Sequence, residues 1–484
     1  MSDVEDVVSL ALLRGYQVHP DALEFLRNSG DLNCLDVVSE AISRKQISGD
    51  EDYTITSKNL IGVVGEIGPA GNNVSESDES ADFESYEVVR DIVRDSKLEE
   101  GITGYKLLFE SRFKKFIELV SKRPDSHRIR RVQDVKASQD KQPVKVAGLL
   151  LRRKVRRKSV EITIDDESGN IDAVVSGSTM IKKVNEMLLD QLVVIDVEYS
   201  KWGKYMVKDL YSPDVPDRVM NVSKKNVYGV FISDIHVGCK TFLAEAFNKF
   251  LLWLSDSDDD IVKKIRYLVI AGDVVDGVGI YPRQDLELEE KSVLKQYEMF
   301  AGLLRKLPNS IKIFVSPGNH DATRQALPQF AISRKYAPDL YEMENVTMLG
   351  NPAVIRLHGV NVLVYHGQSL VDVVASTPGL SFDRPANAMK SLLKARHLAP
   401  MYGGGVMVAP EREDRLVIDE VPDIFHCGHI HIVDSMMYKN TLLLNSGTWQ
   451  SQTKYQQNMG IVPVTGIAPV VNLSTLDVIA KRFA

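Results

Sequence analysis

The sequence predicts an α/β protein in which a layered α/β domain follows a small β-barrel and a short helical module. Three observations predict this order. Residues 223–484 alternate apolar strands with helical segments, residues 143–222 contain about five strands and one helix, and residues 1–50 have helical apolar spacing. The chain has 484 residues, enough for about two to four domains and a sizeable core.

The N-terminal 50 residues predict a small module of three helices that serves interaction or packing. The second of these helices has Pro20 near its start and Gly30 beyond its end, which is the usual asymmetry of helix termini. Residues 51–100 are rich in glycine, serine and acidic side chains, as in "GPAGNNVSESDESADFES". This composition predicts an acidic flexible linker.

The net charge of −7 conceals a strongly uneven distribution of charge. Residues 71–100 hold 10 acidic and 3 basic side chains, whereas residues 101–160 hold 18 basic and 5 acidic ones. Residues 101–142 therefore form a basic connector, with a helix expected near Lys106–Val120. A basic stretch of this kind predicts a polyanionic partner despite the negative total.

Residues 143–222 contain β-rich runs separated by turn signals, with the helical piece "GSTMIKKVNEMLL" after the third run. Five strands with a helix after the third is the order of an OB-fold, a small barrel that often binds single-stranded nucleic acid through a basic groove. Two alternatives stay open: the barrel packs only against a partner protein, and its charged hairpin is merely solvated. The candidate nucleic-acid contacts are Arg152, Arg153, Lys154, Arg156, Arg157 and Lys158.

The five best-defined strands of residues 223–484 share one feature, which is that metal-binding side chains follow each of them. Ligands in layered α/β sheets bind beyond the carboxyl ends of the strands, so these side chains are expected to meet. They are Asp234 and His236 after "VYGVFI", Asp273 after "IRYLVIA", Asn319 and His320 after "IKIFVS", His366 after "VNVLVY", and His429 and His431 after "DIFHC".

The types of these side chains predict a dinuclear metal centre. Alternate residues such as Asp234 and His236 can turn toward one ion, and a glycine before several ligands allows close backbone approach. A mixture of carboxylate, imidazole and amide ligands suits manganese, iron or zinc rather than calcium. Asp273 is the natural bridge between two ions, which together can activate water and stabilise a transferring phosphate.

Other candidate residues have plainer explanations. A histidine in an apolar strand is usually a hydrogen-bonded core residue, and a cysteine beside a site usually packs. Asp276 and Asp321 could orient the ligands or simply belong to turns. The residues left out of the site on these grounds are His358, His397, His426, Cys239 and Cys427.

The motifs D-x-H, G-D-x-x-D-G, G-N-H-D, a single histidine after a strand and G-H-x-H occur in that order between Asp234 and His431. This pattern resembles the calcineurin-like metallophosphoesterases and implies their two-layer β-sandwich flanked by helices. The resemblance implies that His320 is the acid that assists the leaving oxygen. It also assigns Asp234, His236 and His431 to one metal, Asn319, His366 and His429 to the other, and Asp273 to both.

A barrel before such a domain narrows the resemblance. The stretches "SDIHVG", "AGDVVDGVGIYP", "GNHDATRQALPQ" and "YHGQS" are similar to those of the small subunits of archaeal family D DNA polymerases. The resemblance covers about residues 100–484. It implies a proofreading 3′→5′ exonuclease that forms a heterodimer with a large catalytic subunit and takes part in DNA-directed DNA polymerisation.

The expected cofactors are two divalent ions, manganese first and iron or zinc otherwise. The expected partners are the large subunit and single-stranded and primer-template DNA. Two alternative functions remain: a phosphatase or phosphodiesterase of the same superfamily, and a non-catalytic scaffold. Three cysteines, an acidic N-terminus without a signal peptide and no apolar run of about 20 residues predict a cytoplasmic protein without a membrane partner.

Overall fold

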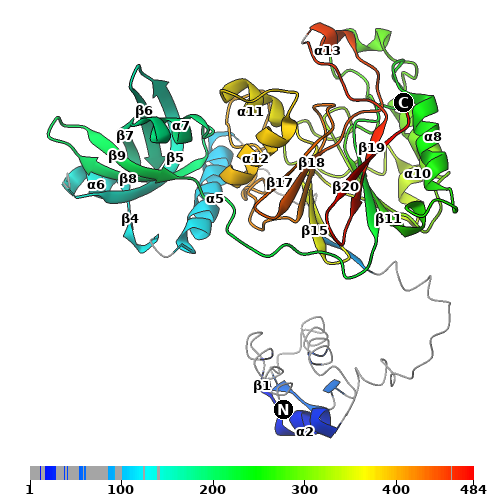
Figure 1. Cartoon of the computed structure of the whole chain (residues 1–484), viewed down its shortest axis with the longest axis horizontal. Coiled ribbons are helices and arrows are strands. Elements are labelled where there is room, and N and C mark those ends of the chain that lie inside the picture. Colours follow the sequence, from blue (N-terminus) through cyan, green and yellow to red (C-terminus); the bar gives the residue numbers. More distant parts are fainter. Residues whose placement is uncertain are drawn as a thin grey trace. The chain divides into compact units, whose positions relative to one another are not determined.

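The computed structural model divides into two units, residues 1–79 and residues 80–484, and each is described by itself. Figure 1 shows the elements of both. The structure describes residues 11, 17–28, 38, 41, 54–57, 59–60, 85–92, 101–123, 126–138, 142–458 and 460–484.

The first unit contains the helix α2 (Pro20–Asn28) and two short paired strands. The strand β1 (Gln17–Val18) runs parallel to β2 (Thr54–Ile55), a pairing that the sequence did not predict. The helix confirms the second of the three predicted helices. The other two lie almost wholly outside the described residues.

In the second unit, a five-stranded barrel follows the long helix α5 (Gly101–Ser121), which confirms the predicted basic helix. Strand β5 pairs with both β6 and β8, and β7 pairs with β9, so the sheet closes on itself. A helix follows the third strand, as predicted. The elements are η2 (Ser126–Arg128), β4 (Ile129–Arg130), α6 (Val132–Ser138), β5 (Val144–Val155), β6 (Ser159–Asp166), β7 (Gly169–Ser176), α7 (Ser178–Asn185), β8 (Leu192–Tyr199) and β9 (Tyr205–Tyr211).

The remainder of the second unit is built on two six-stranded sheets. One has the order β13-β12-β11-β10-β19-β20, and its parallel strands are β10 (Tyr228–Ile232), β11 (Ile265–Ala271), β12 (Lys312–Ser316) and β13 (Val346–Met348). Strands β19 (Ile467–Asn472) and β20 (Val478–Arg482) complete it. The other has the order β17-β18-β16-β15-β14-β3, with β14 (Ala353–Leu357), β15 (Val360–Val364), β16 (Ile424–Cys427), β17 (Asp434–Tyr438) and β18 (Thr441–Asn445).

One hydrophobic cluster joins the two sheets. It contains Phe231 and Phe314 from the first sheet and Ile355 and Ile424 from the second. The opposite faces pack against helices, because side chains point alternately to the two faces of a strand. The helices on the first sheet are α8 (Ala244–Leu254) and α9 (Val293–Leu304), and those on the second are α11 (Leu370–Ser376) and α12 (Pro385–Ala395).

Smaller elements connect these layers. They are η3 (Val262–Lys264), η4 (Gln284–Leu286), α10 (Pro338–Tyr341) and α13 (Lys454–Asn458). The mixed α/β class is thereby confirmed. Among the helices that the structure describes, none combines the length and apolar character needed to cross a membrane.

The predicted flexible linker at 51–100 is wrong for residues 85–92. Residues Tyr86–Arg90 form the strand β3, which pairs antiparallel with β14 at the edge of the second sheet. The Asp91 carboxylate then accepts a hydrogen bond from the Gly350 amide at 2.7 Å. This stretch is ordered because its partner is supplied by a strand far along the chain.

A buried ion pair links helix α5 to the part of the second unit that is built on the two six-stranded sheets. Arg112 Nε lies 2.6 Å from Asp414 Oδ2, and the two side chains are 1% and 0% exposed. Asp414 Oδ2 also lies 3.0 Å from His397 Nε2. His397 is therefore the core residue that the sequence analysis predicted.

Candidate metal centre

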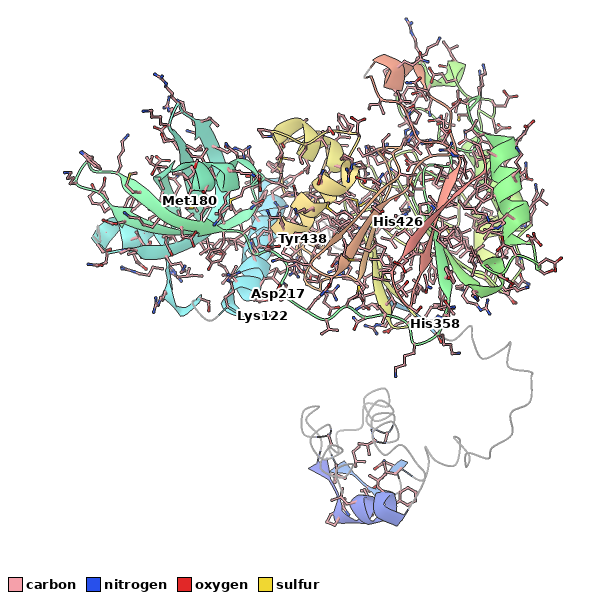
Figure 2. The ribbon with its side chains drawn as sticks, in the orientation of Figure 1. Lys122, Met180, Asp217, His358, His426 and Tyr438 are labelled. Carbon is pink, nitrogen blue, oxygen red and sulfur yellow. The ribbon has the colours of Figure 1, made fainter. Side chains whose placement is uncertain are left out.

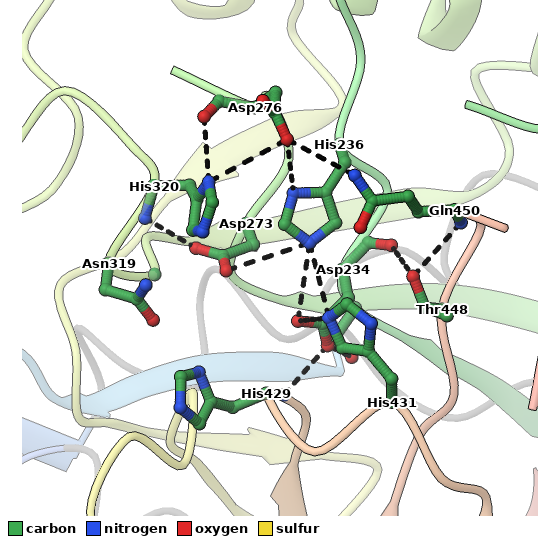
Figure 3. A network of polar contacts seen from close by, with 12 residues as sticks. Asp234, His236, Asp273, Asp276, Asn319, His320, His429, His431, Thr448 and Gln450 are labelled. Atoms are coloured by element: carbon green, nitrogen blue, oxygen red, sulfur yellow. Dashed lines mark hydrogen bonds and ion pairs between the residues drawn. The ribbon is translucent and has the colours of Figure 1, made fainter. Parts of the chain in front are cut away.

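The structure brings all eight predicted site residues to one edge of the two sheets. Each follows the carboxyl end of a strand: β10, β11, β12, β15 or β16. Figure 3 shows most of these side chains converging on one region. The sequence pattern predicted this meeting because the strands are parallel, so their carboxyl ends share an edge.

Five of the eight residues adopt a backbone conformation that sequence inspection did not reveal. Their φ angles are 52° at Asp234, 54° at His236, 51° at Asp273, 68° at His429 and 63° at His431. This left-handed region is uncommon for residues other than glycine and clusters at functional sites. It turns consecutive ligands toward one point while Ile235, between two of them, stays in the core.

The first group of potential ligands consists of Asp234, His236 and His431. His431 Nε2 lies 3.2 Å from Asp234 Oδ1, and His236 Nε2 lies 3.9 Å from the same oxygen. The two imidazole nitrogens are 3.4 Å apart. A carboxylate oxygen and two ring nitrogens thus point into one small space.

The second group surrounds His366. Its Nε2 lies 3.0 Å from Asn319 Oδ1, 3.3 Å from His429 Nδ1 and 3.2 Å from Asp273 Oδ2. The same Asp273 oxygen lies 3.9 Å from His236 Nε2 in the first group. Asp273 therefore stands between the two groups, in the position predicted for a bridge.

Two glycines permit this close packing. A Cβ on Gly272, whose φ is 89°, would lie 2.6 Å from His366 Nδ1. A Cβ on Gly318 would overlap the Asp273 carboxylate. Both positions need glycine because the ligands of neighbouring strands pass directly beside the backbone.

The centre concentrates buried negative charge. Burial opposes ionisation of Asp273, but the charges of His366 and His320 hold its pKa well below the usual range. Burial likewise opposes the protonated form of His366, yet Asp273 raises the pKa of that ring to about 9. The carboxylate charge that raises the pKa of His366 is charge that a divalent cation could also offset.

The donor set fits two divalent cations. Within the described residues, the buried oxygen Asp234 Oδ1 accepts no hydrogen bond, although it faces two imidazoles. Burial lowers the pKa of His429 to about 3, which keeps that ring neutral, as a metal ligand must be. An anionic oxygen left without a hydrogen-bond donor is the expected signature of a place for a cation.

His320 is held by Asp276 rather than by Asp321. His320 Nδ1 lies 2.8 Å from the Asp276 carbonyl oxygen, so Nδ1 carries a hydrogen and Nε2 is directed elsewhere. Asp321 instead accepts hydrogen bonds from the Gly318 amide at 2.8 Å and the Tyr297 hydroxyl at 3.1 Å. Its carboxylate therefore fixes the loop backbone rather than the His320 ring.

An outer layer of polar side chains orients the ligands. Asp276 Oδ1 lies 3.2 Å from His236 Nδ1, and Gln284 donates to Asp276 Oδ2 at 2.8 Å. Gln456 Nε2 lies 2.7 Å from His431 Nδ1. The sequence analysis missed both glutamines, because a lone glutamine beyond a motif carries no recognisable signal.

Two of the histidines that the sequence analysis left out make contacts outside the two groups of potential ligands. His426 Nε2 lies 3.0 Å from Ser446 Oγ, and the His426 ring packs edge-on against Phe231 between the sheets. His358 Nδ1 lies 2.7 Å from the Tyr267 hydroxyl, and Figure 2 labels both of these histidines. These contacts are those of core histidines.

A cavity of about 710 Å³ opens onto the centre. One wall carries the potential ligands and His320. The lining also includes apolar and aromatic side chains, which suit an organic substrate with a flat ring rather than bare phosphate. The apolar wall is formed by Ile280, Tyr281, Pro282, Val371, Phe382 and Ile461.

The six basic residues predicted for nucleic acid do not share one environment. Arg153 turns to the end of α7, where it donates to the carbonyl oxygens of Val184, Asn185 and Met187 at 2.7–3.0 Å. Arg156 pairs with Glu161 at 2.9 Å. The other four are exposed: Arg152, Lys154, Arg157 and Lys158.

The chain is similar in sequence to known subunits of DNA polymerases. The B-subunit family of DNA polymerases alpha and epsilon matches residues 230–432. The DNA polymerase II small subunit of Archaeoglobus fulgidus is 35% identical over 493 residues, covering 99% of this chain and 98% of that protein. The same-named protein of Methanothermobacter thermautotrophicus is 37% identical over 458 residues, covering 92% of this chain and 93% of that one.

Other similarities are partial. The DNA polymerase II small subunit of Pyrococcus furiosus is 39% identical over 416 residues, covering 82% of this chain and 68% of that protein. A solved archaeal phosphodiesterase is 12% identical, covers 53% of this chain and 99% of its own, and gives a TM-score of 0.28. A likeness of that size supports no conclusion.

Proposed function

Because the chain belongs to the family of archaeal DNA polymerase II small subunits, as its sequence predicted, we propose that its metal centre is a 3′→5′ exonuclease that proofreads DNA. The observation that supports this most is the convergence of eight potential ligands and acids from five strand ends, with Asp273 between two groups. The direction of cleavage comes from the family resemblance and is part of the proposal.

Two divalent ions would be held by the two groups that share Asp273, manganese being our first choice and iron or zinc the alternatives. When bound, such ions lower the pKa of water and neutralise charge on a phosphodiester. The chain supplies the ligand positions before any ion arrives, since the left-handed backbone and the outer hydrogen bonds already fix them.

His320 would protonate the oxygen that leaves the shortened strand. Its Nδ1 is engaged by the Asp276 carbonyl oxygen, which leaves Nε2 as the atom that can deliver a proton. Burial disfavours the charged ring, but Asp273 and Asp276 raise the pKa of His320 above its usual value. A raised pKa favours the protonated ring, which is the form that a general acid requires.

The apolar wall of the cavity would receive the terminal base. Tyr281 and Phe382 line the same cavity as the potential ligands, and an unpaired base can reach their rings only after leaving its partner. A mismatched primer end frays more readily than a paired end. Selectivity for errors would then follow from the cost of separating the strands, without any reading of base identity.

The same proposal assigns a role to each of the other parts of the chain. Residues 143–222 would be an OB-fold that contacts DNA, and residues 223–484, completed by strand β3, would be the phosphoesterase. The family name implies a large subunit as partner, which makes the chain one half of a heterodimeric polymerase. Residues 1–50 would serve as an interaction module.

The test is manganese-dependent degradation of single-stranded DNA labelled at its 5′ end. A ladder that shortens from the 3′ end is expected for the wild type. His320→Ala should slow it about 10²- to 10⁴-fold with bound metal unchanged, because only a proton donor is lost. Asp273→Asn should lose both metal and activity, because the shared carboxylate is removed.

Exposed residues provide matched controls. His19→Ala and Asp260→Asn change a 54% exposed and an 87% exposed side chain outside the motifs, and they should behave as wild type. Hydrolysis of a small phosphodiester without DNA degradation would favour the phosphodiesterase alternative. No hydrolysis of either substrate, alone or with the large subunit, would favour the scaffold.

A further inference from the structure

A row of four buried polar side chains connects the space between the two sheets with the metal centre. His426 Nε2 lies 3.0 Å from Ser446 Oγ, which lies 2.7 Å from Ser233 Oγ. Ser233 Oγ in turn donates to Asp234 Oδ2. All four residues are at most 1% exposed, so bulk solvent does not compete for these contacts.

The row crosses from one sheet to the other. Ser233 follows strand β10 of the first sheet, whereas His426, labelled in Figure 2, belongs to β16 of the second and Ser446 follows β18. The backbone of Gly428 packs directly against the row, because a Cβ at that position would overlap both Ser233 Oγ and Asp234 Oδ2. The row is therefore enclosed on both sides by the strands that carry the ligands.

The hydrogens of this row can be placed from its acceptor end. An ionised Asp234 carries no hydrogen, so the Ser233 hydroxyl must donate to it. A serine has one hydroxyl hydrogen, so Ser446 must donate to Ser233 across the second contact. The hydrogen of the third contact then comes from His426, whose Nε2 donates to Ser446.

Two observations on His426 agree with this placement. Burial lowers the pKa of the ring to about 3, so near pH 7 the ring is neutral and carries a single hydrogen. Its Nδ1 is buried without a hydrogen-bond partner among the described residues, and a hydrogen there would have no acceptor.

Ser446 has one competing acceptor, the Cys427 carbonyl oxygen at 3.1 Å. That oxygen already accepts a hydrogen bond from the Ser446 amide at 2.9 Å. The Ser446 hydroxyl is thereby left for the shorter contact with Ser233, as the placement requires.

We propose that His426, Ser446 and Ser233 form a hydrogen-bond relay that positions Asp234 as a metal ligand. The three are positioning residues, because each acts through the next one and the last acts on the carboxylate. Donors in a row polarise one another, so the serine at the end is a better donor than an isolated hydroxyl. This inference rests on the metal centre of the proposed function, but it does not require that the centre cleaves DNA.

The relay decides which Asp234 oxygen faces the ion. Oδ2 accepts from Ser233 and from the His429 amide at 2.9 Å. Oδ1 accepts no hydrogen bond within the described residues and lies 3.2 Å from His431 Nε2, in the first group of potential ligands. Rotation of the carboxylate would break both bonds to Oδ2, so the relay keeps Oδ1 aimed at the metal position.

Calorimetric titration of manganese into the metal-free full chain tests the relay. Ser446→Ala should weaken binding about 10-fold or more, because loss of an outer hydrogen bond typically lowers metal affinity about 10- to 100-fold. Thr441→Val is the matched control, since Thr441 is 0% exposed on β18 and donates to the Pro422 carbonyl oxygen at 2.7 Å. It also loses a buried hydrogen bond, but it should leave manganese affinity unchanged.

Two changes at His426 separate donation from packing. His426→Gln can place an N–H donor near the position of Nε2 and should bind manganese as the wild type does. His426→Phe retains a ring but cannot donate, and it should weaken binding as Ser446→Ala does.

Nuclear magnetic resonance of nitrogen-15-labelled histidine rings tests the direction of the relay without any metal. In the metal-free wild type, His426 should carry its hydrogen on Nε2 and show a bare Nδ1. The signals that disappear in His426→Gln identify this ring among the histidines.

Three kinds of result would overturn the proposal. A hydrogen on Nδ1 of His426 would contradict the direction of donation. Unchanged manganese affinity in Ser446→Ala, or equal weakening in Thr441→Val, would show that the Ser446 hydroxyl only supports the fold. Equal affinities of His426→Gln and His426→Phe would show that the ring only packs.

Failure of the exonuclease is distinguishable from failure of the relay. A wild type that binds manganese but degrades no DNA would refute the exonuclease, and the expected differences in affinity among the variants would still support the relay. A wild type without affinity for manganese would refute the metal centre and the role of the relay together.

Discussion

Replacing Arg112 by methionine should destabilise the second unit by about 3–5 kcal/mol, because the change leaves a buried carboxylate without its cation. Arg112 Nε and Asp414 Oδ2 are 2.6 Å apart, and both side chains are almost completely buried. Arg112 also donates to the Pro400 carbonyl oxygen at 2.9 Å. Methionine retains the aliphatic bulk, so the loss reports chiefly on the charge and its hydrogen bonds.

The loss should depend on pH through His397. In the wild type, burial and the charge of Arg112 lower the pKa of His397 from 6.5 to about 4. Between these values the unfolded chain binds a proton that the folded chain does not, so stability falls by about 3 kcal/mol as pH falls through this window. Without the charge of Arg112, the pKa of His397 rises and its protonated ring can pair with Asp414.

The destabilisation by Arg112→Met should therefore be largest near pH 8 and shrink toward pH 5. Urea unfolding followed by circular dichroism at both pH values measures it. Lys106→Met is the control on the same helix, because its pair with Glu110 is exposed and contributes no more than about 0.5 kcal/mol. Equal losses for the two variants, or a loss that grows toward pH 5, would refute the reasoning.

Three further predictions concern the metal centre. Gln456→Ala should weaken metal binding about 10- to 100-fold in calorimetric titrations, because it removes the hydrogen bond that orients a ligand, while its exposed neighbour Gln457→Ala should not. Gly318→Ala should abolish metal binding because a Cβ there meets the Asp273 carboxylate, whereas Gly302→Ala, with open space in α9, should stabilise the fold by up to about 1 kcal/mol. Phe382→Ala should lower the ratio of mismatched to matched cleavage and leave hydrolysis of a small phosphodiester unchanged; an unchanged ratio would contradict the role of the apolar wall.

Much of the centre could be predicted because its information is local in sequence. Each ligand stands directly after an apolar strand, and strand order fixes the edge at which parallel strands end. The left-handed backbone at Asp234 or His429 could not be predicted, because packing with neighbouring strands selects it. The contact of Asp276 with His320 could not be predicted either, because it depends on where a loop returns.

Two errors outside the centre have equally physical causes. Strand β3 looked like linker because its few apolar residues are sufficient only beside β14, which the local composition does not show. Arg153 looked like one more basic residue of an exposed hairpin. An irregularity between Leu150 and Arg152 shifts the alternation of β5, so Arg153 shares the inward face of its partner Ile162 and reaches α7.

Strand β3 has a consequence for the synthesis of the protein. It emerges from the ribosome before the whole barrel and long before β14, its partner at the sheet edge. The barrel can fold while β3 is still unpaired. The second sheet can be completed only after both β3 and β14 have been synthesised. A recombinant fragment beginning at residue 223 would lack β3 and leave the edge of β14 open to pairing with another copy. A fragment meant to contain the complete second sheet should therefore begin before residue 85, and it will include the barrel.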